Sequence, residues 1–334
     1  MRVLVGTHER CFEHWAGPGH PESPERLAAV LVGVAEAEDA GADLARWAPR
    51  PARREELVGV HSAAYLDALE SFCRSGGGRL DPDTGAVPES WEAALVAAGA
   101  GPDAVGRLRA GEGAAAFLAV RPPGHHATAR TPMGFCLLNN IAVTAMHLAD
   151  QGERVLIVDW DAHHGNGTQD VFFSDGRVAY VSMHQWPLYP GTGAVEETGA
   201  GDGAGLTLNL PFPPRTAGDT YRAAIDRTLA PLAERLDPTW VLLSAGFDSH
   251  RADPLASLGL SAGDYVDLTS RVVELAPPGR RIVFLEGGYD LDALTASTAA
   301  CVAALAGLEL RPEAVTTGDR GIEVVDAAAV SLTR

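Results

Sequence analysis

The chain has 334 residues, 46% of them hydrophobic, and its 26 Lys and Arg against 44 Asp and Glu give a formal net charge of −18. This acidic balance argues against a protein that holds nucleic acid through its net charge, because phosphate backbones are bound by an excess of basic side chains. The four cysteines form no CxxC pair, so the sequence indicates neither a thiolate zinc site nor a disulfide framework.

Six short apolar runs, rich in β-branched residues, alternate with longer Ala- and Leu-rich segments, which is typical of an α/β fold. The runs are Arg2–Val5, Ala115–Val120, Val155–Val158, Val178–Ser182, Trp240–Ser244 and Ile282–Leu285. Because they are continuously apolar, we expect strands covered on both faces in a central, mainly parallel sheet flanked by helices. No linker divides the chain, so residues 1–334 are predicted to form one domain.

No segment is long enough to span a bilayer, and the first residues lack the pattern of a secretion signal. We therefore expect a soluble, cytoplasmic protein, bacterial in type, with no membrane partner. Oligomeric state is not readable, and the absence of a long insertion between Leu80 and Trp91 favours a monomer.

Polar segments follow the apolar runs, and in open parallel sheets ligands bind beyond the carboxyl ends of the strands. These segments are therefore expected to meet in one crevice. They are Thr7-His8, Pro122–His126, Asp159–His164, His184, Gly246–Asp248 and Glu286–Tyr289.

The strongest local signal is the segment Asp159–Gly167, DWDAHHGNG. Side chains two apart at a strand end point the same way, so Asp159, Asp161 and His163 share one face. Carboxylates and an imidazole suit zinc, and Asp248 is the candidate third ligand of a site with an open position for water. Iron or cobalt would accept the same ligands. The alternative is that these aspartates cap helices or turns.

Two adjacent imidazoles, His125 and His126, follow a stiff Pro-Pro turn and could act as electrostatic partner and general base. Asp159 could hold His125 and Asn166 could hold His126, which would make the two rings differ in basicity. Tyr289 follows two glycines at another strand end. Its phenol could donate a hydrogen bond to a carbonyl oxygen that becomes an oxyanion.

Aromatic residues in Gly134–Cys136 and Trp186–Gly191 could wall a narrow apolar channel, although core packing is their commoner role. Asp81 or Asp83 could reach the channel rim and hold a substrate backbone. The sequence does not choose between them, and a solvated loop carboxylate is the usual alternative.

Five segments, in order, resemble the histone deacetylase family, and the resemblance runs from His20 to about Tyr289. The segments are His20–Leu27, Arg121–His126, Gly134–Cys136 with Asn139-Asn140, Asp159–Gln169 and Glu286–Tyr289. The resemblance implies a single-domain, arginase-like three-layer α/β fold. It assigns zinc to Asp161, His163 and Asp248, and it implies that His126 is the base, His125 its electrostatic partner and Tyr289 the carbonyl-polarising donor.

The family also carries structural monovalent cations, usually potassium. By position, one such site would use Asp159, Asp161, His163, Ser182 and Met183, largely through backbone oxygens, and a second would use Phe172, Asp175 and Val178. Ions bound by carbonyl groups leave little side-chain signature in a sequence.

Asn166, which is Asp in some branches of the family, resembles the class II and bacterial amidohydrolase branch, and a tyrosine at position 289 resembles its active members. The implied activity is removal of acetyl or other acyl groups from an amine, acyl-lysine first, by attack of a metal-activated water. The substrate would be a small molecule or a peptide, and partner proteins are unknown. The substrate channel is assigned to Gly134, Phe135, Tyr189, Leu255 and Gly287.

Three alternatives stay open. An acetylpolyamine amidohydrolase would share the chemistry, but the family's polyamine-selective branch has an acidic residue where this sequence has Leu255, and an unpaired ammonium beside an apolar rim would be poorly solvated. An arginase-like dimanganese enzyme would need more carboxylates than a chain with glycine at position 165 offers. A binding module without turnover would lack a ligand, the base or the tyrosine.

Overall fold

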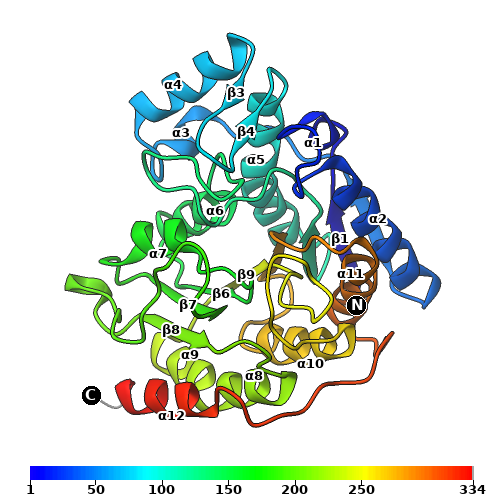
Figure 1. The fold of residues 1–334 in the computed structure, drawn as a ribbon, viewed down its shortest axis with the longest axis vertical. Coiled ribbons are helices and arrows are strands. Elements are labelled where there is room, and N and C mark those ends of the chain that lie inside the picture. Colours follow the sequence, from blue (N-terminus) through cyan, green and yellow to red (C-terminus); the bar gives the residue numbers. More distant parts are fainter. Residues whose placement is uncertain (333–334) are drawn as a thin grey trace.

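The computed structural model describes residues 1–332 and contains an eight-stranded sheet in which every neighbouring pair is parallel (Figure 1). The strand order is β2-β1-β5-β10-β9-β6-β7-β8. The strands are β1 (Val3–Gly6), β2 (Leu44–Trp47), β5 (Ala115–Leu118), β6 (Val155–Asp159), β7 (Val178–Gln185), β8 (Thr207–Phe212), β9 (Trp240–Ala245) and β10 (Arg281–Leu285). A separate antiparallel hairpin pairs β3 (Gly78–Arg79) with β4 (Gly85–Ala86).

Helices cover the sheet, and Figure 1 shows it between two helical groups. Helices α2, α10 and α11 pack together, and α5 and α6 form a second pair against β5 and β6. The helices are α1 (Arg10–Glu13), α2 (Pro24–Asp39), α3 (Arg54–Leu57), α4 (Ala63–Arg74), α5 (Ser90–Arg109), α6 (Asn140–Ala149), α7 (Asn166–Phe172), α8 (Gly218–Ala224), α9 (Ala230–Leu236), α10 (Ala262–Val273), α11 (Leu291–Leu305) and α12 (Ile322–Ser331). The predicted fold class, a parallel sheet flanked by helices, is confirmed.

All six predicted apolar runs form strands of the central sheet, although some of their ends shift. The six strands are buried along their whole length, as continuous apolar strands between two helical layers should be. Strands β2 and β8 were not predicted. Both lie at sheet edges, where a strand needs less apolar sequence, and β8 is interrupted by Asn209 and Pro211.

The strand order positions the site. Strands β5, β10, β9 and β6 are neighbours in the sheet, so the loops that follow their carboxyl ends lie side by side. Two site motifs also begin helices: the side chain of Asn139 caps α6 by accepting the Ala142 N–H, and Asp290 caps α11 by accepting the Ala293 N–H. Within residues 1–332 no helix is long and apolar enough to cross a membrane. The assignment of residues 1–334 to one domain stays a prediction.

Candidate active site

Two strand-end loops bring the predicted metal ligands together. Asp161 and His163 follow β6, and Asp248 follows β9. The Nδ1 atom of His163 lies 3.1 Å from Oδ1 of Asp161 and 3.0 Å from Oδ2 of Asp248. One donor atom from each residue lies within 4.8 Å of the others, so a single cation could contact all three.

Glycines make room for the two carboxylates. A Cβ atom on Gly246 would lie 2.1 Å from Oδ2 of Asp161, and one on Gly287 would lie 2.2 Å from Oδ2 of Asp248. The N–H of Gly287 donates to Oδ2 of Asp161 at 2.8 Å. Gly287, which the resemblance assigned to the channel, therefore lies against the carboxylates, and it is not among the residues that line the cavity described below.

The charges of this cluster favour a cation. Burial alone would lower the pKa of His163, but hydrogen bonds and charge from Asp161 and Asp248 raise it to about 10. Burial and the charge of Asp161 raise the pKa of Asp248 to about 7. The two carboxylates thus attract positive charge strongly, and a metal ion held there would replace the proton of His163. Two carboxylates and one imidazole form a donor set that zinc accepts with a coordination position left open.

The adjacent histidines are held by different partners. Nδ1 of His125 lies 2.9 Å from Oδ2 of Asp159, and Nδ1 of His126 lies 2.8 Å from Oδ1 of Asn166. Their ring centroids are 4.0 Å apart. Because an amide oxygen only accepts, the proton of His126 is on Nδ1, and Nε2 keeps its lone pair.

The pKa values of the two rings move in opposite directions. Burial would lower the pKa of His125, but the charges of Asp159 and Asp161 raise it well above its ordinary value. Burial, together with positive charge on His125 and His163, lowers the pKa of His126 well below its ordinary value. A charged imidazole therefore stands beside a neutral one, which is the state a general base requires.

Glu286 anchors the histidine loop, a role that sequence reasoning missed. Its carboxylate accepts the N–H groups of Gly124 at 2.7 Å and of His125 at 3.2 Å. Burial raises the pKa of Glu286 to about 7. Glu286 stood within a recognised segment, and a buried acidic residue at a strand end was the available signal.

Tyr289 is positioned by two further residues that were missed. Asp253 accepts the Tyr289 N–H at 2.7 Å, and Arg26 donates to the carbonyl oxygen of Gly288 at 2.6 Å. The guanidinium carbon of Arg26 lies 4.7 Å from the centroid of the phenol ring. Burial raises the pKa of Tyr289 well above its ordinary value, so the phenol is protonated and can donate a hydrogen bond.

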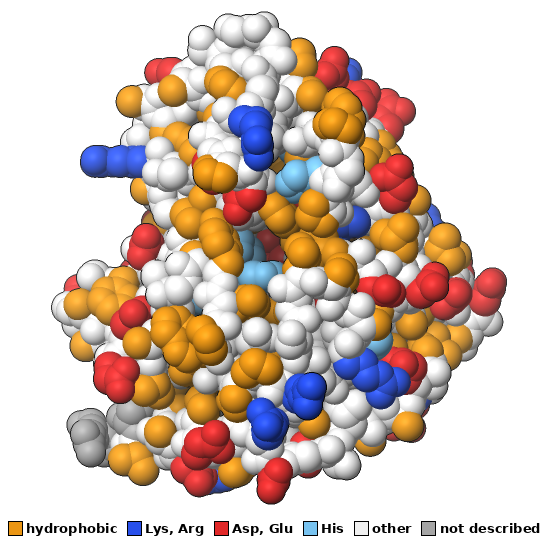
Figure 2. Space-filling model, viewed as in Figure 1, with side chains coloured by type: hydrophobic (Ala, Val, Ile, Leu, Met, Phe, Trp, Pro, Cys, Tyr) orange, Lys and Arg blue, Asp and Glu red, His pale blue; other side chains and the backbone are white. Residues whose placement is uncertain are grey.

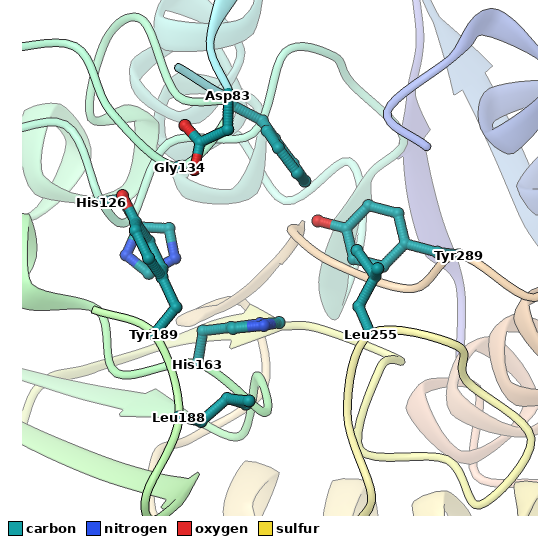
Figure 3. Close-up of a pocket in the computed structure, with 9 residues that line it drawn as sticks. Asp83, His126, Gly134, His163, Leu188, Tyr189, Leu255 and Tyr289 are labelled. Carbon is teal, nitrogen blue, oxygen red and sulfur yellow. The ribbon is translucent and has the colours of Figure 1, made fainter. Parts of the chain in front are cut away.

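His126, His163 and Tyr289 meet in a cavity of about 210 Å³, which opens at the surface in Figure 2 with histidine atoms at its base. In Figure 3 the Tyr289 hydroxyl points into the cavity from the side opposite His126. The lining residues are Asp83, His126, Gly134, Phe135, His163, Leu188, Tyr189, Leu255 and Tyr289. Four of the five residues assigned to the channel thus line it, and the fifth is Gly287.

The structure distinguishes the two rim aspartates. Asp83 lines the cavity, whereas Asp81 turns its Oδ1 to the N–H groups of Asp83 and Thr84. Burial and the neighbouring Asp81 raise the pKa of Asp83.

The residues assigned to potassium lie in two places. Asp159 and Ser182 pair across β6 and β7, and the Asp159 carboxylate already contacts His125 and the Tyr180 hydroxyl. The carbonyl oxygen of Met183 accepts the Tyr221 hydroxyl at 3.4 Å.

At the second predicted potassium site, carbonyl oxygens of the assigned residues already accept hydrogen bonds. Those of Phe172 and Asp175 accept the N–H groups of Asp175 and Val178 at 3.1 and 3.5 Å. Both potassium sites stay predictions.

Comparisons with known proteins agree with this geometry. Residues 20–305 match the family profile described as "Histone deacetylase domain". A "Probable deacetylase" of Archaeoglobus fulgidus is 40% identical over 320 residues, which is 93% of this chain and 88% of that protein. A "Histone deacetylase-like amidohydrolase" of Pseudomonas aeruginosa is 35% identical over 314 residues, 86% of this chain and 82% of that one. The crystal structure of the HDA15 HD domain superposes with a TM-score of 0.91 at 35% identity, covering 99% of this chain and 94% of the other.

Proposed function

The chain belongs to the histone deacetylase family and is a hydrolase of the deacetylase type, and from this premise we propose that it is a zinc-dependent deacylase acting first on acyl-lysine. One observation carries the proposal. His163, the neutral imidazole of His126 and the protonated phenol of Tyr289 line one cavity, and His163 joins that cavity to the buried carboxylates of Asp161 and Asp248. We propose that the whole chain serves as one catalytic domain around it.

The three-residue cluster would hold the zinc ion, which, when bound, would supply Lewis acidity that makes a water more acidic and the amide carbonyl more electrophilic. Nε2 of His126 takes the proton of the attacking water, since its Nδ1 proton is committed to Asn166. The Tyr289 phenol donates a hydrogen bond to the carbonyl oxygen as that oxygen gains negative charge. The C–N bond breaks when the histidine pair returns a proton to the nitrogen, and the products are a carboxylic acid and a free amine.

The charge on His125 has a place in this scheme. Asp159 holds its Nδ1 atom at 2.9 Å, which fixes the ring and favours the imidazolium form. A positive charge beside His126 keeps that neighbour neutral and able to accept a proton.

The cavity wall supports an acyl-lysine substrate. Phe135, Leu188 and Leu255 present apolar surface, which suits the methylene chain of lysine. An acetylated polyamine is the second candidate, favoured by the Asp83 carboxylate in the wall and by the acidic chain. Leu255 disfavours an acetylated polyamine, because the distal ammonium of that substrate would lack a charged partner beside this residue.

Initial rates on matched substrates test the proposal. Wild type and Tyr289→Phe are assayed with an acetyl-lysine peptide, longer acyl-lysine peptides and acetylated polyamines, with zinc supplied. We expect peptide turnover that falls roughly 10²- to 10³-fold in kcat in the variant, as for the loss of an oxyanion donor. Tyr265→Phe is the matched control, because it removes a buried hydroxyl that has no hydrogen-bond partner among the described residues.

The other outcomes are equally informative. Faster hydrolysis of acetylated polyamines would move the assignment to the second candidate. Metal-supplied protein that hydrolyses no acyl amide would favour a binding module. Metal analysis of protein purified without a chelating column decides between zinc and iron or cobalt.

A further inference from the structure

Several hydrogen bonds hold the tip of the β3–β4 hairpin beside the cavity. Oδ1 of Asp81 accepts the N–H groups of Asp83 at 2.8 Å and of Thr84 at 2.5 Å, and the Leu80 N–H donates to the carbonyl oxygen of Thr84 at 2.8 Å. His20 Nε2 donates to the carbonyl oxygen of Asp83 at 2.9 Å. The side chain of Thr84 is therefore presented from a fixed backbone, and the residue is only 1% exposed.

The hydroxyl of Thr84 is oriented by its two partners. It lies 3.1 Å from Oδ1 of Asp83 and 3.2 Å from the backbone nitrogen of Phe135. The Phe135 N–H can only donate. The hydroxyl must accept that bond with a lone pair, so its single proton is free to go to Asp83.

The turn that contains Phe135 has a backbone conformation that phenylalanine seldom adopts. Residues 133–136 form a tight turn, closed by reciprocal hydrogen bonds between Met133 and Cys136. Both central residues have positive φ, +54° at Gly134 and +69° at Phe135. Bulky residues are strained in that region of φ, which persists only where surrounding contacts hold it.

This backbone places the Phe135 ring on the cavity wall. Its centroid lies 5.7 Å from that of Tyr289 and 4.6 Å from that of His20, edge-on to both. Gly134 lies against His126, because a Cβ atom there would come within 2.4 Å of that ring. The turn is therefore packed against the base on that side.

We propose that Thr84 is a positioning residue for substrate specificity: its hydroxyl holds Phe135 in the strained turn and joins that wall of the cavity to the Asp83 carboxylate. The inference rests on the proposed function in so far as the cavity is taken as the acyl-amine channel. Thr84 does not line the cavity and acts through Phe135 and Asp83. A substrate that engages both the apolar wall and the rim carboxylate should depend on it most.

Two substitutions at one position test this role. Thr84→Val keeps the shape and removes the hydroxyl, which takes the acceptor from the partly buried Phe135 N–H, whereas Thr84→Ser keeps the hydroxyl. We expect Thr84→Val to raise KM for an acetyl-lysine peptide roughly ten-fold, with kcat nearly unchanged, because loss of one hydrogen bond lowers the population of the binding-competent turn by about that factor. Thr84→Ser should return KM to near the wild-type value.

Thr298→Val is the matched control, because Thr298 is fully buried in α11 and its hydroxyl has no hydrogen-bond partner among the described residues. A merely structural role for Thr84 would lower the folded fraction, and with it kcat, at constant KM. That result, or a KM that does not move in Thr84→Val, would overturn the proposal.

Crystal structures of the two variants give a readout that needs no activity. We expect Phe135 to leave positive φ in Thr84→Val and to keep positive φ in Thr84→Ser. An unchanged turn in both variants would refute the proposed role of Thr84. If the wild type hydrolyses no acyl amide, the proposed function fails. The backbone conformation of Phe135 in the two variants still tests whether Thr84 positions it.

Discussion

Replacing Asn166 by Asp tests why the adjacent histidines differ. The Asn166 amide oxygen accepts the Nδ1 proton of His126 at 2.8 Å without adding charge. A carboxylate of nearly the same shape would keep the hydrogen bond and add a negative charge, which stabilises the imidazolium form. Aspartate occupies this position in some branches of the family that the sequence resembles, so we expect the variant to fold.

The size of the effect follows from the contact. An opposite charge at hydrogen-bond distance shifts a pKa by roughly 1–3 units, and a shift of about 2 units corresponds to about 2.7 kcal/mol. In the wild type, burial and the charges of His125 and His163 hold the pKa of His126 well below its ordinary value, so the base is neutral throughout the neutral range. In Asn166→Asp the pKa rises, and activity should be lost as the pH falls through this raised value.

The assay is kcat/KM for an acetyl-lysine peptide between about pH 5 and pH 10, since this parameter reports the free enzyme's base. We expect the acidic limb of Asn166→Asp to lie about 2 pH units above that of the wild type, with activity recovering at alkaline pH. Asn166→Ala is the control, because it removes the hydrogen bond without adding charge and should lower kcat/KM without that displacement. If Asn166→Asp falls by one factor at every pH, His126 is not the titrating base.

Three further predictions concern the metal, the substrate and the buried ion pairs. A chelator should abolish turnover. Because the metal replaces the His163 proton, metal affinity should rise with pH up to about 10 when it is measured by competition with a chromophoric chelator. A metal affinity that does not change with pH would argue against His163 as a ligand. Leu255→Glu should move the ratio of kcat/KM towards acetylated polyamines by roughly ten-fold, and an unchanged ratio would remove Leu255 as a determinant. Glu22→Gln should destabilise the fold by about 3–5 kcal/mol in urea titrations, because it leaves the fully buried Arg121 unpaired. Burial opposes ionisation of Glu22, but the charge of Arg121 holds the pKa of Glu22 well below its ordinary value. The difference in free energy of unfolding between wild type and Glu22→Gln should therefore be at its full size above about pH 4 and should shrink as the pH falls further.

Local sequence predicted those parts of the molecule that short-range rules determine. Continuous apolar runs predicted the buried strands, and the Asp-x-His spacing after one strand predicted that Asp161 and His163 share one face. Asp248 could be added because parallel strands end at one edge of the sheet. The contacts of His125 with Asp159 and of His126 with Asn166 were inferred from chemistry and are present in the structure.

The residues that were missed act over long sequence separations. Arg26 donates to Gly288 across 262 positions, and Glu286 reaches back 162 positions to Gly124. No periodicity or spacing reports such pairs, because packing of the loops brings them together. Thr84 stood in a loop of polar residues, and only the positive φ of Phe135 shows what its hydroxyl does.

The buried charges of the site lead to a last prediction. Four carboxylates at the strand ends are fully buried, those of Asp159, Asp161, Asp248 and Glu286. Burial raises the pKa values of Asp248 and Glu286 to about 7, which shows that positive charge from nearby side chains does not balance all four.

A divalent ion in this cluster would supply the missing charge, so zinc should stabilise the native state. A ligand present at about 1,000 times its Kd contributes about 4 kcal/mol, and the thermal midpoint should rise by several degrees. Asp248→Asn keeps the shape of the side chain but removes one anionic ligand, so zinc should stabilise this variant far less. If zinc raised the midpoints of wild type and Asp248→Asn equally, the ion would be binding elsewhere, and the assignment of the metal to these strand ends would have to be abandoned.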